Sequence, residues 1–239
     1  MKNAAYALCQ ERLKYKPGTA FAYGGASMQI GGRIVEIVGG KPWEQLFQER
    51  IAKPLGMTHT SFYGLGVTDN PLVAGGAKSS AREYTRFLQM IANKGVWQGR
   101  RILSEAAVNE LCSNQTGFVP LLHPYQQPGT VMVDVGERAD YGICVWRITQ
   151  EPFSNALSTQ TLVEIASQGR MGFSPWYDVR RNCIGVLATQ TPLRKMNPTY
   201  RTLKKILREI MPLPQAVALT HGASVTTSTV TTASTVRKR

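Results

Sequence analysis

The chain changes character near residue 140, and this change restricts its fold more than any other feature of the sequence. Before it, apolar residues recur at helical spacing, whereas after it come short β-branched and aromatic runs separated by turn signals. These runs are YGICVWRI (141–148), QTLVEIAS (160–167) and NCIGVLATQ (182–190). They predict three strands of one antiparallel sheet, with SPWYD at 174–178 as a candidate for a further short pairing. The sequence therefore predicts an α+β fold.

A helix and a polar tail follow the strands. The segment 198–210 has one apolar face suited to packing on the sheet, made by Leu203, Ile206, Leu207 and Ile210. From residue 212 the chain lacks a core pattern, so 212–239 is predicted to be a disordered tail. The domain is then predicted over 1–211, with a helical part at 1–139 and the sheet with its helix at 140–211. A chain of 239 residues with 43% hydrophobic content can bury a sizeable core.

The helical part contains several helix start and stop signals. One helix is predicted over 3–14, and another follows Ser27 as its N-cap, with an apolar stripe of Met28, Ile30, Ile34, Val35 and Val38. Gly31-Gly32 inside this second helix indicates that another backbone passes close. Further helices are predicted between Pro42 and Pro54, after a Ser79-Ser80 cap with Glu83 in the first turn, and over 105–111. Residues 113–139 lack periodicity and are predicted to form a long loop.

The net charge of +13 suggests an anionic partner, but the distribution of the charge argues against one. Basic residues crowd the C-terminal helix without the aromatic residues that stack nucleic-acid bases: Arg194, Lys195, Arg201, Lys204, Lys205 and Arg208. This pattern favours a solvated basic face and no nucleic-acid partner. No apolar run is long enough to cross a membrane, and the first 17 residues lack the apolar segment of a signal peptide.

Cysteine and histidine positions give no sign of a metal or a cofactor. The four cysteines match neither a zinc motif nor a disulfide framework, and Cys144 and Cys183 lie in strand-like runs where cysteine behaves as a small buried hydrophobe. The three histidines are isolated in the sequence. Gly64-x-Gly66 lacks the third glycine of a dinucleotide fingerprint. We therefore expect no metal and no cofactor.

Tyr23 lies in a small-residue loop, PGTAFAYGGAS, just before the second helix. A tyrosine in a glycine loop at a helix N-terminus can be a catalytic acid/base held in a positive field. It can equally be an ordinary turn aromatic, and the pattern alone favours this second interpretation.

The order of several motifs is more specific than any one of them. PGTxFxYGG, PLGM (54–57), AGGAKSSAREYTRFLQMIANKG (74–95) and SQGRMGFSPWYD (167–178) together resemble the serine β-lactamase family, over roughly residues 1–210. The resemblance is narrowest to class C-like enzymes, D-Ala-D-Ala peptidases and esterases. It implies a β-lactamase/transpeptidase-like fold and a small-molecule ester, amide or peptidoglycan-like substrate. In that family, Ser-x-x-Lys supplies the nucleophile, Tyr-x-Asn shuttles protons, and a Lys-Thr-Gly or His-x-Gly strand anchors the substrate.

Two of these elements have counterparts in the chain, each of them altered. Tyr23 matches the proton-shuttling tyrosine, and Gly25 replaces the asparagine, as the esterase-like branches do more than the β-lactamases proper. Without the amide, one donor to a substrate carbonyl is lost. Ser167-Gln168-Gly169 matches the third element, with Gly169 retained for close backbone approach and Ser167 in place of the cation. The neighbouring Arg170 is a candidate to compensate in part.

The nucleophile element has no counterpart. No lysine has a serine three residues before it, and Thr202-x-x-Lys205 and Thr235-x-x-Lys238 lie at the wrong end of the chain for the family. Helix capping explains Ser27, Ser79 and Ser80. By this resemblance we expect the C-terminal portion of such an enzyme, incomplete at its N-terminus. Such a portion is expected to expose a sheet edge, and so to self-associate or to depend on another polypeptide.

Two functions of different classes remain open. The first is an esterase-like serine hydrolase in which Tyr23 is the proton shuttle and the nucleophile comes from sequence outside this chain. The second is a non-catalytic remnant or ligand-binding module of the same fold.

Overall fold

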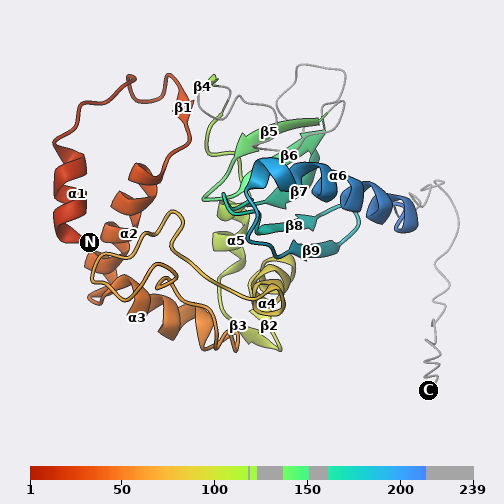
Figure 1. The fold of residues 1–239 in the computed structure, drawn as a ribbon, viewed down its shortest axis with the longest axis horizontal. Coiled ribbons are helices and arrows are strands. Elements are labelled where there is room, and N and C mark those ends of the chain that lie inside the picture. The colour runs from red at the N-terminus through yellow and green to blue at the C-terminus, as the bar shows by residue number, and fades with distance from the viewer. Residues whose placement is uncertain (118, 123–136, 151–160, 214–239) are drawn as a thin grey trace, which may run out of the picture.

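Helices, one five-stranded antiparallel sheet and the two-stranded pairs β1-β4 and β2-β3 combine in an α+β arrangement in the computed structural model, which describes residues 1–117, 119–122, 137–150 and 161–213 (Figure 1). Most of the predicted tail and much of the predicted loop at 113–139 lie outside these residues. The helices are α1 (Lys2–Cys9), α2 (Gly25–Gly39), α3 (Trp43–Phe47), the π-helix η1 (Gln48–Ala52), α4 (Ala81–Ala92), α5 (Glu105–Leu111) and α6 (Leu193–Ile210). The strands are β1 (Phe21–Ala22), β2 (Val96–Trp97), β3 (Arg100–Arg101), β4 (Leu121–Leu122), β5 (Glu137–Tyr141), β6 (Trp146–Gln150), β7 (Thr161–Ala166), β8 (Ser174–Asp178) and β9 (Cys183–Leu187).

The main sheet has the strand order β5-β6-β7-β8-β9, with every pair antiparallel. The three predicted strands are confirmed as β6, β7 and β9, and SPWYD forms a strand of its own, β8, paired on both sides. β5 corrects the prediction of a loop up to residue 139. Its sequence ERADY has only Ala139 and Tyr141 at alternate positions, too short a pattern to predict a strand. The strand pairs residue by residue with β6, from Glu137–Gln150 to Tyr141–Trp146.

A tight turn divides the first predicted run, 141–148, between the last residue of β5 and the first three residues of β6. The Gly142 amide donates to the Val145 carbonyl at 2.9 Å, and Cys144 has a positive φ of 59°. Cys144 is exposed in this turn, which corrects its predicted place in a buried strand. A Cβ at Gly142 would lie 2.3 Å from the Leu111 carbonyl oxygen, so the turn passes α5 too closely for any side chain. Cys183 does lie in a strand, β9, and is half-buried.

Apolar clusters cover both faces of the sheet. On one face, Ala166 and Trp176 pack against Tyr200 of α6, and Figure 1 shows this helix lying across the strands. On the other face, Ile165 belongs to a cluster with Met90 of α4. The consecutive residues Ile165 and Ala166 thus face opposite sides, as expected for a strand buried on both faces.

α6 differs from its prediction in length and in surroundings. It begins at Leu193, five residues earlier than expected, and includes Pro198, which removes one hydrogen bond of the helix. Leu203 and Leu207 pack on the sheet as predicted, whereas Ile206 and Ile210 are exposed.

The basic face of α6 is only partly solvated, which corrects the prediction of a solvated face. Lys204 Nζ lies 2.5 Å from Glu164 Oε2 on β7, and Arg208 Nη2 lies 3.4 Å from Glu137 Oε1 on β5. Glu164 is completely buried. Burial raises the pKa of Glu164, and the charges of Lys204 and Arg208 oppose this shift.

The N-terminal helices also depart from prediction. α1 ends at Cys9, where the amides of Gln10 and Glu11 close the last turn on Ala7 and Leu8. The N-cap of α2 is Gly24, so Ser27 is not the predicted cap. Ser27 lies in the first turn and donates its hydroxyl to the Gly24 carbonyl at 3.2 Å.

The apolar stripe of α2 faces solvent, and its polar residues face inward. Of the predicted stripe, Ile34 (55%), Val35 (44%) and Val38 (84%) are exposed, as is the neighbouring Ile37 (64%), and Met28 and Ile30 are half-buried. Gln29, Gly32 and Glu36 are buried. Polar contacts hold the inward face: the Gln29 amide donates to the Pro71 carbonyl at 2.9 Å and accepts from the Val73 amide at 3.1 Å. A Cβ at Gly32 would meet the Val73 side chain at 2.7 Å, while nothing lies within 4 Å of one at Gly31. The close neighbour of the glycine pair is therefore a side chain and not the expected backbone.

Candidate functional site

Tyr23 lies between β1 and α2, inside a cluster of aromatic rings. Its ring stacks on that of Trp146, with centroids 5.5 Å apart and an interplanar angle of 21°, and meets Tyr141 edge-on at 5.6 Å. Phe21 contacts Tyr141 at 5.1 Å. Tyr141 and Trp146 are buried, and Tyr23 is half-buried. Aromatic pairs of this kind contribute about 0.5–1.5 kcal/mol each beyond their buried area, so the Tyr23 loop is fixed to the sheet.

Ser167-Gln168-Gly169, the match to the third family element, begins the turn from β7 to β8. The Ser167 amide donates to the Pro175 carbonyl at 3.3 Å, and the Gly169 amide donates to the Phe173 carbonyl at 2.7 Å. These two N–H groups are satisfied within the turn, so neither is free to bind a substrate oxygen. A Cβ at Gly169 would lie 3.3 Å from the Phe173 oxygen, which shows how closely the two sides of the turn approach.

The strand register brings the two elements to the same end of the sheet. Trp146, on which Tyr23 stacks, is the β6 partner of Ala166 on β7, and Ser167 follows Ala166 directly. Neighbouring strands lie about 4.8 Å apart, so the Tyr23 loop contacts the strand next to the one from which the Ser167 turn leaves.

The other two predicted site residues flank this region. Gly25 is the first residue of α2, and a Cβ added to it would lie 3.1 Å from Cβ of Ala74. Arg170 is exposed, and its carbonyl accepts a hydrogen bond from the amide of Leu193 at 3.0 Å. The region thus contains a phenol, a serine hydroxyl and an exposed guanidinium, which suit proton transfer and the binding of an anionic group.

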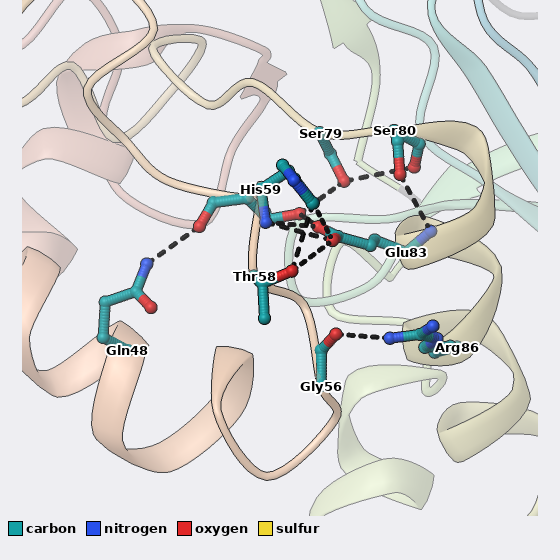
Figure 2. Close-up of polar contacts among 9 residues, drawn as sticks. Gln48, Gly56, Thr58, His59, Ser79, Ser80, Glu83 and Arg86 are labelled. Atoms are coloured by element: carbon teal, nitrogen blue, oxygen red, sulfur yellow. Dashed lines mark hydrogen bonds and ion pairs between the residues drawn. The ribbon is translucent and has the colours of Figure 1, made fainter.

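A second polar cluster centres on Glu83 of α4, which is 4% exposed (Figure 2). Its carboxylate accepts hydrogen bonds from the Thr60 hydroxyl at 2.6 Å and from the His59 amide at 3.0 Å, and lies 3.0 Å from His59 Nδ1. Burial alone would raise the pKa of Glu83, but the hydrogen bonds from Thr60 and His59 outweigh it and lower this pKa. The cluster joins the 58–60 loop to α4.

The sequence predicted the Ser80 cap in this cluster but not the contacts of the Glu83 side chain. Ser80 caps α4 as expected, accepting from the Glu83 amide at 3.2 Å. In a capping box, the glutamate side chain would return to the N-cap amide. Here it bonds instead to residues 58–60, a contact that nothing in the local sequence signals.

Two further observations bear on the kind of site. Among the described residues, no three or more histidine, cysteine, aspartate or glutamate side chains gather as metal ligands would. Within the same residues, no helix combines the length and hydropathy needed to cross a bilayer.

Comparison with known proteins identifies the family. A family model described as Beta-lactamase matches residues 2–169, so the chain belongs to the β-lactamase family. The structure of a candidate β-lactamase from Bacteroides dorei superimposes with a TM-score of 0.66 at 28% identity, covering 85% of this chain and 63% of that one. A variant of simvastatin synthase from Aspergillus terreus superimposes with a TM-score of 0.65 at 16% identity, covering 88% of this chain and 60% of that one. The fold is therefore β-lactamase/transpeptidase-like.

Similarity to a curated sequence covers a shorter stretch. A candidate D-alanyl-D-alanine carboxypeptidase of Escherichia coli K12 is 40% identical over 63 residues, which are 26% of this chain and 13% of that protein. The chain thus spans less than two thirds of the length of these relatives.

Proposed function

We propose that this domain supplies the proton-transfer and substrate-anchoring groups of an esterase-like serine hydrolase. The stacking of Tyr23 on Trp146 carries the proposal, because it holds a phenol beside the strand end from which the Ser167 turn leaves. Tyr23 takes the proton of an attacking hydroxyl as the hydroxyl adds to the carbonyl carbon. It then returns this proton to the leaving group as the ester, amide or peptidoglycan-type bond breaks.

The attacking hydroxyl comes from sequence that is not part of this chain. The absence of any serine three residues before a lysine supports this assignment. The serines near α2 and α4 have structural partners: Ser27 bonds to Gly24, and Ser80 caps α4.

The substrate side is formed by Gly25, Ser167, Gly169 and Arg170. A Cβ at position 25 would lie 3.1 Å from the Cβ of Ala74, so an asparagine there would require Ala74 to move slightly. The missing amide donor at Gly25 supports an ester substrate over a β-lactam. Ser167 stands where the family has a cationic residue. The exposed guanidinium of Arg170 provides the positive charge for the anionic end of a substrate instead.

A non-catalytic ligand-binding module is the alternative. The paired amides of Ser167 and Gly169 favour it, because they reduce the donors available to an oxyanion.

We also propose self-association through the open edge of β9, which among the described strands pairs only with β8. Neither function involves nucleic acid.

Activity and labelling of the purified chain test whether it is catalytic without a further polypeptide. We expect no turnover of a chromogenic ester or cephalosporin and no acylation by a fluorophosphonate. Turnover by the chain alone, lost in Tyr23→Phe and kept in Tyr6→Phe, would contradict both the external nucleophile and the non-catalytic alternative. Tyr6 is a suitable control because it is 70% exposed on α1.

Ligand binding tests the substrate side without chemistry. N-acetyl-D-alanine, a small carboxylate, should shift the NMR amide signals of residues 167–170 and bind about tenfold more weakly to Arg170→Ala, since a charge-assisted hydrogen bond is worth about 1.5–3 kcal/mol. Arg82→Ala, on exposed helix surface, should bind like the wild type. Equal affinity in all three proteins would remove Arg170 from the site.

A further inference from the structure

The turn between β7 and β8 is fastened to α6 and to the segment before it. The Gln168 side-chain amide lies 3.5 Å from the Tyr200 hydroxyl, and the Leu193 amide donates to the Arg170 carbonyl at 3.0 Å. Gly172, with φ of 85°, packs so tightly that a Cβ would lie 2.3 Å from the Thr191 carbonyl oxygen. The candidate substrate turn is therefore contacted from the α6 side at residues 168, 170 and 172.

Tyr200 is itself fixed in place. It is completely buried, its ring meets Trp176 edge-on at 5.2 Å, and Lys204 Nζ lies 5.4 Å from the ring centroid. Lys204 in turn is paired with Glu164, three residues before Ser167 on β7. The Tyr200 hydroxyl is thus a fixed point relative to the strand that leads into the turn.

The chemistry of the contact suits a permanent support. Burial, and then the nearby charge of Glu164, raise the pKa of Tyr200 far above its ordinary value, so the hydroxyl stays neutral and can donate or accept. Gln168 Oε1 is buried and accepts no hydrogen bond from the described residues. Rotating the amide by half a turn would place this oxygen against Tyr200, so in either orientation the hydroxyl is the partner of the amide.

We propose that Tyr200 is a positioning residue for the candidate site. Its contact with Gln168 fixes the backbone position of the neighbouring Ser167 and Gly169. Its relevance to substrate rests on the proposed function, whereas its effect on the turn does not. A residue that only fills the core would act through its ring, while the positioning role requires the hydroxyl. Tyr200→Phe separates the two, because it keeps the ring contacts with Trp176 and Lys204.

The matched control is Tyr177→Phe. The Tyr177 hydroxyl bonds to Asn182 Oδ1 at 3.1 Å, at the end of β8 away from the turn. Both variants remove one phenolic oxygen, Tyr200 from α6 and Tyr177 from β8, so a difference between them reports on the position of the oxygen.

We expect Tyr200→Phe to shift the NMR amide signals of residues 167–170 and to speed hydrogen exchange of the Gly169 amide about fivefold, the equivalent of one neutral hydrogen bond. Binding of N-acetyl-D-alanine should weaken by a similar factor. Tyr177→Phe should change none of these quantities. A folded Tyr200→Phe with unchanged amide signals and exchange in the turn would overturn the proposal.

A second variant keeps the test decisive if Tyr200→Phe does not fold. Gln168→Met removes the amide from the turn side and should give the same faster exchange at Gly169, and unchanged exchange would again overturn the proposal. If the wild-type chain binds no N-acetyl-D-alanine at the turn, the proposed function fails. The Gly169 exchange rates still decide whether Tyr200 positions the turn.

Discussion

Glu83 accepts more hydrogen bonds than its local sequence suggests, and we expect its charge to be needed for stability. Glu83→Gln should lower the free energy of unfolding by about 1–3 kcal/mol, because a buried acceptor of several donors loses its charge. Glu105→Gln is the control, since this exposed carboxylate contacts Lys94 at 2.8 Å on the surface and should cost less than about 1 kcal/mol. Urea denaturation measures both, and equal losses would show that burial of Glu83 adds nothing.

The lowered pKa of Glu83 predicts a dependence of stability on pH. The folded-state pKa lies below the ordinary value of 4.5, so on acidification the unfolded state binds the proton first. The stability from this group is therefore complete above about pH 5 and is lost as the pH falls through the folded-state pKa. The stability difference between the wild type and Glu83→Gln should shrink as the pH falls below about 5. A constant difference would contradict the direction of the shift.

Gly172 tests how tightly the β7–β8 turn is packed. Gly18 and Gly172 both have positive φ, but only Gly172 has neighbours within 4 Å of an added Cβ. Gly18→Ala should lower the free energy of unfolding by about 1 kcal/mol, because alanine disfavours the left-handed backbone conformation. Gly172→Ala should lower the free energy of unfolding by about 1–3 kcal/mol more than Gly18→Ala does, because the added methyl group also overpacks the turn. Thermal unfolding of the two variants gives the comparison, and similar melting temperatures would mean that the turn can move away from Thr191.

Single residues show where sequence reasoning succeeds. Ser80 was predictable as a cap because capping depends on residues close in the chain, and the structure confirms it. The ring contacts of Tyr23 join residues more than 100 positions apart, so no local pattern contains them. The role of Tyr23 in proton transfer stays a prediction.

At the scale of elements, the Lys204–Glu164 pair determines how α6 sits on the sheet. Lys204→Met should destabilise the chain by about 3 kcal/mol, because the buried carboxylate of Glu164 keeps only the more distant Arg208, 4.0 Å away, as a partner. The double variant Lys204→Met/Glu164→Met should recover most of this loss. Burial raises the pKa of Glu164, so in Lys204→Met stability should fall as the pH rises above 4.5. Chemical denaturation at two pH values tests both expectations. An unstable double variant would show that lost packing, and not the unpaired charge, causes the destabilisation.

Strands were predictable in proportion to their apolar content. QTLVEIAS and NCIGVLATQ carry β-branched runs and form β7 and β9, whereas ERADY forms β5 without any such signal. β5 depends on pairing with β6 and on the ion pair of Glu137 with Arg208. Both of these contacts exist only after the chain has folded.

At the scale of the whole molecule, α2 exposes a continuous apolar surface. Val38→Lys should change the free energy of unfolding by less than about 0.5 kcal/mol, since the side chain is 84% exposed. It should also reduce binding of the dye ANS more than Val67→Lys does, because Val67, at 86% exposure, lies in a loop outside the α2 surface. Fluorescence titration and urea denaturation measure the two effects. A loss of more than about 1.5 kcal/mol in Val38→Lys would mean that this face is covered in solution.

The outward apolar face of α2 also affects the calorimetry of the chain. Heat capacity rises on unfolding because apolar surface enters water, and the α2 side chains are already in water before unfolding begins. The heat-capacity increment of unfolding per residue should therefore fall below the usual 12–15 cal/mol/K. The decrease should be roughly the fraction of the apolar area of the chain that is already exposed in the folded state. The curve of stability against temperature should be correspondingly flat.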